Sequence, residues 1–190
     1  LLEGGFGGAL SPVNRSGAAE IQGLKAYASL LDVPGPVEHA IIAVPVAGVE
    51  AALLECAQKG VRVVQVFTAG FAEVDAAGAR MQQRLVDICR GAGMRMIGPN
   101  SLGTLNPKTR FFATFSTFLN GMQPRAGVIG LATQSGAFGS ATYGMATLRG
   151  IGLSRVVATG NEADVDVAEC IDYLADDPDT RVICAALEAC

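Results

Sequence analysis

Short apolar segments alternate with helix-length segments through the first half of the chain, and this alternation restricts the possible folds strongly. Apolar runs at 39–44, 61–67 and 95–97 have the length and the β-branched content of buried strands. The segments between them, 49–59 and 76–90, have the length and periodicity of helices. Strands that alternate with helices of this size form parallel sheets, so the sequence predicts an α/β fold with helices on both faces of its sheet.

The ends of the predicted strands indicate where a ligand would bind. Parallel sheets bind ligands at the carboxyl ends of their strands. Here those ends are 44–47, 68–71 and 98–103, and all three are small or polar. Pro45 and Pro99 are also explained as simple strand terminators. The three ends nevertheless leave room for a ligand at one edge of the sheet.

A second strand, turn and helix occupy residues 127–148. The apolar run 127–132 leads into the small, polar residues 133–136 and then into the helix-forming segment 137–148. Such a turn leaves backbone N–H groups at a helix N-terminus, where the helix dipole also favours negative charge. An anion site here would use the amides of Gln134, Ser135, Gly136 and Ala137. The alternative is that Ser135 only caps the helix.

The alternation continues to the end of the chain, with strands predicted at 155–159 and 181–187 and a helix at 167–174. The acidic segment 176–179 is most simply a solvated turn, which makes its carboxylates poor candidates for acid–base chemistry. Glu188 differs, because it follows an apolar strand at the carboxyl end, where a charge is costly without a partner.

Charge and cysteine content exclude several classes of protein. A net charge of −4 and a pI near 5.0, with no Lys/Arg cluster, argue against a nucleic-acid surface. No apolar run approaches the roughly 18 residues that span a bilayer, and a chain that begins with Leu1 is expected to be a fragment. The cysteines form no C-x-x-C pair and no metal-ligand spacing, so we expect no metal site. They are expected to be reduced, buried thiols of a cytoplasmic protein: Cys56, Cys89, Cys170, Cys184 and Cys190.

Several blocks of sequence resemble one enzyme family. In the second half these are Thr-Gln-Ser-Gly-Ala-Phe-Gly at 133–139, Arg-Gly-Ile-Gly-Leu-Ser at 149–154, Thr-Gly-Asn-Glu-Ala-Asp-Val-Asp at 159–166 and Tyr-Leu-Ala-Asp-Asp-Pro-Asp-Thr at 173–180. In this order and spacing they resemble the NDP-forming (ADP-forming) acyl-CoA synthetases, or acetate–CoA ligases, which are related to the succinyl-CoA synthetase α subunit. The strand ends of the first half look like the CoA-binding domain of the same enzymes, so the resemblance covers nearly the whole chain.

The resemblance implies two parallel-sheet domains. Residues 1–107 would form a Rossmann-like CoA-binding domain that lacks its first strand, and residues 126–190 a truncated, flavodoxin-like domain of the succinyl-CoA synthetase type. The intervening residues 108–125 have little periodicity and several Phe side chains. We expect a linker that these side chains pin to the surface, with an acyl pocket lined by them as the alternative.

The resemblance also assigns roles to residues. Coenzyme A would be bound by Asn14, Arg15, Pro45, Val46, Thr68, Ala69, Gly70 and Asn100. Phosphate would be bound by Gln134, Ser135, Gly136, Ala137, Gly160 and Asn161. Glu188 would orient a catalytic histidine that is absent from this chain. The sequence departs from the family at Arg15-Ser16, where Pro-Lys is usual, and at Ser101, where Cys is usual, so position 101 is expected to pack or form hydrogen bonds.

The activity implied is the reversible conversion of acyl-CoA, ADP and phosphate into a small carboxylic acid, CoA and ATP through a phosphohistidine. His39, the single histidine, lies outside the family motif and is expected to be a packing residue. The fragment should therefore be inactive alone. The complete enzyme would need an ATP-grasp domain or β subunit that binds ADP or ATP with Mg²⁺, and an oligomer is expected.

Two other functions fit parts of the sequence. The first is a non-catalytic CoA-binding module that regulates a protein acyltransferase, which would lack the synthetase histidine and carry an acetyltransferase domain. The second is a nicotinamide-dependent oxidoreductase. It is less well supported, because no G-x-G-x-x-G opens a helix in the first half with an acidic residue about 20 positions later.

Overall fold

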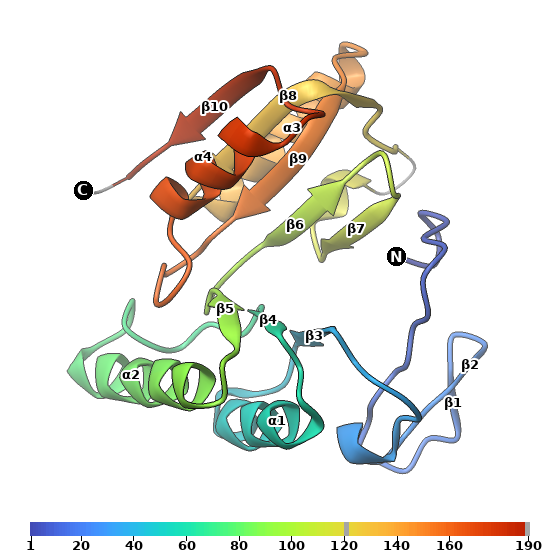
Figure 1. Ribbon diagram of the computed structural model, residues 1–190, viewed down its shortest axis with the longest axis vertical. Helices are drawn as coiled ribbons and strands as arrows, with labels where there is room; N and C mark the ends of the chain where they lie inside the picture. The colour runs from blue at the N-terminus through green and yellow to red at the C-terminus, as the bar shows by residue number, and fades with distance from the viewer. Residues whose placement is uncertain (120–121, 189–190) are drawn as a thin grey trace.

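The computed structural model describes residues 1–119 and 122–188 and contains two main sheets, one above the other in Figure 1. The first sheet is parallel, in the order β3 (His39–Ile42), β4 (Val63–Val66) and β5 (Arg95–Ile97). The second sheet has the order β10-β8-β9-β6-β7, formed by β6 (Gly103–Asn106), β7 (Phe111–Thr114), β8 (Ala126–Thr133), β9 (Leu153–Ala158) and β10 (Val182–Ala186). Near the N-terminus, β1 (Glu20–Ile21) pairs with β2 (Leu24–Lys25). Two short 3-10 helices are η1 (Leu30–Asp32) and η2 (Thr117–Leu119).

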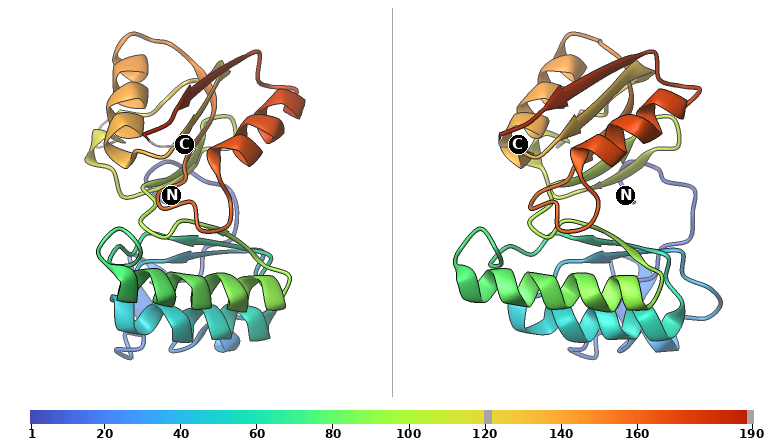
Figure 2. Two further views of the ribbon diagram at one scale, coloured as in Figure 1. Left: turned by 90° about the vertical axis from the view of Figure 1, so that its left-hand side faces the viewer. Right: turned by 60° about the vertical axis from the view of Figure 1, so that its left-hand side comes forward.

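Helices α1 (Val46–Lys59) and α2 (Ala76–Gly91) cover the same face of the first sheet, which corrects the expectation of helices on both faces (Figure 2). The strand order runs in one direction, so successive right-handed crossovers place both helices on one side. Val64 and Val66 share one buried cluster with these helices. Gln65, between them, faces the other side, where its side-chain amide donates to the Ala113 carbonyl at 2.9 Å.

In the second sheet, helices α3 (Gly136–Leu148) and α4 (Val167–Asp176) lie on opposite faces (Figure 2). The chain passes from β8 through α3 to β9 on one side, then returns through α4 to β10 on the other side of β8. Right-handed crossovers in opposite directions require opposite faces. This reversal makes the carboxyl end of β8 a topological switch point, which is where open α/β sheets bind ligands.

The segment predicted as a linker contains regular structure. Strand β7 lies within residues 108–125 and pairs antiparallel with β6, which in turn pairs antiparallel with β9. Leu105 of β6 faces Phe112 of β7, and both are buried in the core of the second sheet. The predicted boundary at residues 107 and 108 therefore falls inside a hairpin that extends the second sheet. Its partner strand β9 begins at residue 153, far along the sequence, so local periodicity gave no sign of it.

Asp164 joins the two sheets through a carboxylate that is only 2% exposed. It accepts hydrogen bonds from Arg95 Nε at 2.9 Å, from the Met96 amide at 2.9 Å and from Arg90 Nε at 3.3 Å. Arg95 also forms an ion pair with Glu169 at 2.8 Å. The loop after β9 is thereby fastened to β5 and the end of α2, which fixes how the strand ends of the two sheets meet.

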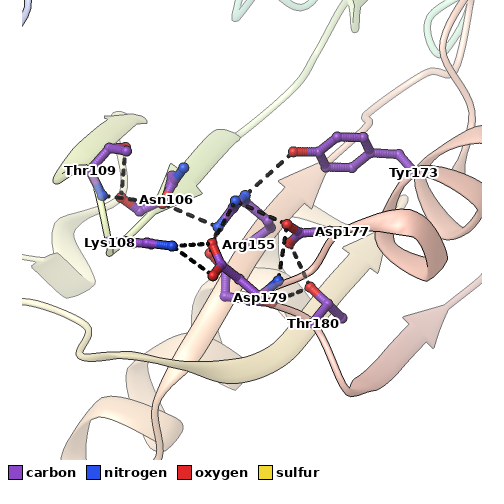
Figure 3. A network of polar contacts seen from close by, with 9 residues as sticks. Asn106, Lys108, Thr109, Arg155, Tyr173, Asp177, Asp179 and Thr180 are labelled. Atoms are coloured by element: carbon purple, nitrogen blue, oxygen red, sulfur yellow. Dashed lines mark hydrogen bonds and ion pairs between the residues drawn. The ribbon is translucent and has the colours of Figure 1, made fainter.

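The acidic segment at 176–179 is not simply a solvated turn (Figure 3). Asp177 is buried and accepts a hydrogen bond from Arg155 of β9 at 3.2 Å. Asp179 accepts from Arg155 at 3.2 Å and from Lys108 of the β6–β7 connection at 2.7 Å. Hydrogen bonds from Lys108 and Arg155 lower the pKa of Asp179. These carboxylates hold the hairpin to the sheet, and neither lines the pocket described below.

The cysteines divide between core and surface. Cys56, Cys89 and Cys170 are free and buried, as predicted, and burial raises the pKa of their thiols, to about 11 for Cys56 and about 12 for the other two. Cys184 is free but exposed on β10, so its predicted burial is wrong. Cys190 lies outside the described residues. Within the described part of the chain, no helix has both the length and the apolar character that a membrane-crossing segment needs.

Candidate functional site

One pocket lies where the strand ends of the two sheets meet, with a volume of about 380 Å³. It is lined by Glu73, Asn100, Leu102, Phe115, Gln134, Ser135, Gly136, Ala137, Gly160, Asn161 and Glu188. Every residue predicted to bind phosphate is in this lining, together with Asn100 and Glu188. Two members were not predicted, Glu73 and Leu102, and Phe115 belongs to the Phe-containing segment for which an acyl pocket was the alternative to a linker. The pocket thus unites residues from distant parts of the chain at the switch point of the second sheet.

Ser135 caps helix α3 at the wall of this pocket. Its backbone is extended, and its Oγ accepts a hydrogen bond from the Phe138 amide at 3.2 Å. Gly136 and Ala137 are the first two residues of the helix, where no intrahelical carbonyl is available to their amides. No partner for these two amides is found among residues 1–119 and 122–188. They lie at the positive end of the helix dipole and line the pocket, as an anion site requires.

The other two amides predicted as anion donors are already bonded. The Gln134 N–H donates to the Ala186 carbonyl at 3.2 Å, because β10 runs beside β8 up to this point. The Ser135 N–H donates to Thr133 Oγ1 at 3.1 Å. A candidate anion site therefore consists of the first two helix amides. The structure shows Ser135 as the helix cap, and anion binding at this turn stays a prediction.

Replacing Ser135 separates these two roles. Ser135→Ala is expected to lower the free energy of unfolding by about 1 kcal/mol, since the Phe138 amide loses its acceptor. Ser135→Asp keeps a capping oxygen but places a negative charge at the two free amides, so it should retain stability and weaken phosphate binding at least tenfold. Urea denaturation and ³¹P NMR titration measure the two effects.

The control is Asp166→Ala at the N-cap of α4, which should lower the free energy of unfolding by a similar amount without changing phosphate binding. Phosphate binding by Ser135→Asp equal to wild type would exclude the anion site.

The side chain of Gln134 ties three segments together. Its Nε2 donates to Glu162 Oε2 at 2.6 Å, and its Oε1 accepts the Glu188 amide at 2.7 Å. Glu162 also accepts hydrogen bonds from Thr159 Oγ1 at 2.9 Å and from the Val167 amide at 2.8 Å. Glu162 was not a predicted site residue, although it stands in the Gly-Asn-Glu block. It holds the loop after β9 against the turn after β8.

Asn161 lines the pocket, but its side chain is engaged in contacts between the sheets. Its Nδ2 donates to Glu73 and, at 3.0 Å, to Gln82 Oε1. Its Oδ1 accepts from Asn100 Nδ2 at 3.2 Å, and its backbone N–H donates to the Pro99 carbonyl at 2.9 Å. In this arrangement the side chain of Asn161 holds the two loops that line the pocket together. Its predicted direct contact with phosphate would require a new side-chain orientation.

Glu73 accepts hydrogen bonds from both sheets at the pocket. Its carboxylate accepts from the Gly70 amide at 2.5 Å, from the Phe71 amide at 3.2 Å and from the side-chain amide of Asn161. Burial acts to raise the pKa of Glu73, but hydrogen bonds from the Gly70 amide and from Asn161 outweigh it, so the pKa is lowered. Glu73 is therefore a carboxylate at neutral pH.

Most residues predicted to contact CoA lie beside one another at the carboxyl ends of the first sheet: Pro45, Val46, Thr68, Ala69, Gly70 and Asn100. Gly70 has a φ of +111°, and a Cβ there would lie 2.8 Å from Val46 Cγ2, so this close approach needs glycine. The Asn100 amide donates to the Thr68 carbonyl at 2.9 Å. We call these loops the CoA rim. Asn100 of the rim lines the pocket, and the Gly70 amide donates to Glu73, which lines it too.

Asn14 and Arg15 are not brought to this rim. Arg15 forms an ion pair with Glu55 of α1 at 2.6 Å, and Asn14 Oδ1 accepts the Ser16 amide at 2.8 Å. Because Glu55 is about 14 Å along the helix axis from the start of α1, this ion pair holds Arg15 away from Pro45 and Val46. A contact between Arg15 and a CoA phosphate remains a prediction, and it would have to compete with Glu55.

Glu188 reaches the pocket from the end of β10, with its amide bonded to Gln134. It is exposed, so the cost of burying a charge, which the sequence suggested, does not arise. His39 begins β3, and its ring lies against Phe111 at a tilt of 38°, with ring centroids 5.5 Å apart. Burial lowers the pKa of His39. It does not line the pocket, and this geometry agrees with the packing role predicted for it.

Ser101 is fully buried and forms hydrogen bonds, as expected at a position where a thiol is usual. Its Oγ donates to the Ala158 carbonyl at 2.5 Å and accepts the Gly103 amide at 3.0 Å. It joins the strand end after β5 to β9, directly behind the pocket.

Comparison with known proteins adds independent findings. Residues 5–107 match the family described as CoA binding domain, and residues 126–190 match the succinyl-CoA ligase like flavodoxin domain. The chain is 41% identical to the α subunit of ADP-forming acetate–CoA ligase I of Pyrococcus furiosus, over 99% of the chain and 40% of that subunit. It is 40% identical to the ADP-forming 4-hydroxybutyrate–CoA ligase of Nitrosopumilus maritimus, over 86% of the chain and 23% of that protein. A solved structure of the dinucleotide-forming acetyl-coenzyme A synthetase 1 of Ca. Korarchaeum cryptofilum, in complex with phosphate and ADP, superposes with a TM-score of 0.92 at 37% identity, over the whole chain and 39% of that protein.

Proposed function

The chain belongs to the CoA-binding domain family and joins that domain to a succinyl-CoA ligase-like domain, as the ADP-forming acyl-CoA ligases do, and from this premise we propose that it is the CoA-binding part of such a ligase. The reaction is the interconversion of acyl-CoA, ADP and phosphate with a carboxylic acid, CoA and ATP. Since the chain spans 40% or less of the relatives described above, the activity of the whole protein is part of this proposal.

The observation that carries the proposal is the composition of the pocket. Asn100, at a strand end of the first sheet, lines the same pocket as the two free amides of α3. Acyl-CoA held at Pro45, Val46, Thr68, Ala69, Gly70 and Asn100 would bring its thioester toward these amides. Phosphate held there would attack the acyl carbon, so that a C–O bond forms, the C–S bond breaks, CoA leaves as its thiolate and an acyl phosphate remains.

The same pocket has an apolar side that suits an acyl group. Leu102 and Phe115 line it, with Leu102 close to Gly136, and Phe115 is 59% exposed while its ring packs edge-on against Phe67. The relatives are named for acetate and for 4-hydroxybutyrate, so we propose only a small carboxylic acid as the substrate.

The subsequent step would transfer the phosphoryl group from the acyl phosphate to a histidine nitrogen and release the carboxylate. We propose that Glu188 orients this histidine, which must come from outside residues 1–190 because the only histidine here is His39. The 190 residues should thus bind CoA but not turn over. ADP or ATP with Mg²⁺ would bind to an ATP-grasp domain or β subunit, where the metal neutralises phosphate charge, and the active form is expected to be an oligomer.

The decisive experiment incubates the parent protein with ATP and Mg²⁺ and measures its mass. We expect an acid-labile phosphate that is discharged by CoA plus a carboxylic acid. Glu188→Ala should slow formation of this phosphoenzyme by roughly 100-fold or more, because the imidazole loses the group that fixes its orientation. Glu50→Ala, which removes an exposed partner of Arg84, is the control and should react like wild type.

The other outcomes have definite meanings. CoA binding without any phosphoenzyme would favour the alternative, a regulatory CoA-binding module of a protein acyltransferase. A normal phosphoenzyme rate in Glu188→Ala would retain the ligase and remove the role of Glu188. Turnover by residues 1–190 alone would contradict the requirement for an outside histidine.

A further inference from the structure

Glu73 stands between the two parts of the proposed site. The segment that supplies Thr68, Ala69 and Gly70 to the CoA rim ends at Glu73, and the carboxylate turns back to accept the Gly70 and Phe71 amides. Its second oxygen also accepts the side-chain amide of Asn161, which belongs to the loop after β9. One side chain therefore contacts the CoA rim and the loop beside the phosphate turn.

The contacts continue from Asn161 to the phosphate turn. Asn161 precedes Glu162, whose carboxylate accepts Gln134 Nε2 at 2.6 Å. Gln134 directly precedes Ser135, the N-cap of α3. A displacement of the CoA rim can thus reach the helix amides through one carboxylate, one loop and one glutamine, all in direct contact.

The charge of Glu73 is unusual for a pocket that takes an anion. A carboxylate near phosphate repels it, and among the described residues no cation forms an ion pair with Glu73. Its charge is compensated by three N–H donors instead, two from the backbone and one from Asn161. A group that serves only to attract phosphate would not be a carboxylate, so its role lies in the hydrogen bonds that it accepts.

We propose that Glu73 is a positioning residue that couples the CoA rim to the phosphate turn, so that CoA and phosphate strengthen each other's binding. This inference rests on the proposed function. CoA that orders the 68–73 segment fixes Glu73, and Glu73 fixes Asn161 and the loop that supports Gln134. Phosphate then meets amides that are already in place, and by thermodynamic linkage phosphate strengthens CoA binding by the same factor.

The test is calorimetric titration of the intact protein with CoA, with and without saturating inorganic phosphate at constant ionic strength. For wild type we expect phosphate to lower the Kd of CoA by about fivefold or more, within the usual range of such couplings. In Glu73→Gln, which keeps the size of the side chain but loses its charge, the ratio of the two Kd values should fall to within about twofold of one. Glu50→Gln, the same exchange on the exposed face of α1, should keep the wild-type ratio.

Two further measurements separate coupling from general damage. Asn161→Ala cuts the same connection from the other side and should also bring the ratio close to one, and combining it with Glu73→Gln should add nothing. Titration with phosphate, with and without CoA, must return the same factor as titration with CoA.

The outcomes distinguish this inference from the function on which it rests. A wild-type protein that binds no CoA overturns both. A wild-type protein that binds CoA and phosphate independently, or a Glu73→Gln variant that retains the full ratio, overturns the coupling alone and leaves the proposed function intact.

Discussion

Gly160→Ala is expected to lower the free energy of unfolding by about 3 kcal/mol and to weaken the binding of CoA and phosphate at least tenfold. Gly160 has a φ of +69°, in the left-handed region, which costs an alanine roughly 1–2 kcal/mol. A Cβ there would also lie 2.5 Å from the Pro99 carbonyl oxygen and 2.6 Å from the Asn100 carbonyl. These are backbone atoms, so the loops must separate, and the hydrogen bonds that join Asn161 to Pro99 and Asn100 would break.

The chain offers a closely matched control for this substitution. Gly150 has the same φ of +69°, but a Cβ there would meet no atom within 4 Å. Gly150→Ala should lower the free energy of unfolding only by the cost of the left-handed backbone, roughly 1–2 kcal/mol, and should leave ligand binding unchanged. Urea denaturation and CoA titration of both variants give the comparison. Equal stability losses would mean that the contact between the two loops does not constrain the pocket.

Some strands of the fold can be predicted from the local sequence, and others cannot. The strands of the first sheet are recognisable because Val63–Val66 is a local apolar run between two helix-length segments. Strands β6 and β7 are different, because their stability depends on β9. Leu105 is buried beside Phe112 and Val156, and its pairing with Val156 joins residues about fifty positions apart. Periodicity within a segment carries no information on such a partner.

The pocket illustrates the same limit for side chains. The turn at Ser135 follows from local residue types, as does the presence of ligand-sized room at the strand ends, and the structure brings these parts together. Which amides remain available does not follow locally, since the Gln134 amide is taken by Ala186 of a neighbouring strand. Glu73 was missed for a similar reason, because its partner Asn161 is 88 residues away. Polar groups at a domain contact are fixed by tertiary structure, and only motif resemblance hints at them.

Asp164→Asn is expected to lower the free energy of unfolding by about 3 kcal/mol at pH 7. The carboxylate is 2% exposed and accepts hydrogen bonds from Arg90, Arg95 and the Met96 amide. Asparagine fills the same volume but turns an amide donor toward these donors, so at least one buried hydrogen bond is lost with the charge attraction. Because the arginines are half-exposed and can be hydrated again, the loss should lie at the lower end of the range for breaking a buried ion pair.

The pH dependence of this loss identifies the charge as its cause. Burial acts to raise the pKa of Asp164, but the Met96 amide and the two arginines outweigh it, so the pKa in the folded protein is lowered. A carboxyl group with a lowered pKa stabilises the fold above its unfolded pKa, about 3.9, and the contribution is lost as the pH falls through the folded value. The difference between wild type and Asp164→Asn should therefore be constant from pH 7 to about pH 5 and shrink at more acidic pH. The control is Asp87→Asn on the exposed face of α2. Among the described residues, the contact that this change affects is the hydrogen bond from Gln83, so a change below about 0.5 kcal/mol is expected at every pH. A difference for Asp164→Asn that stays the same at acidic pH would show that packing, and not the carboxylate charge, joins the two sheets at this point.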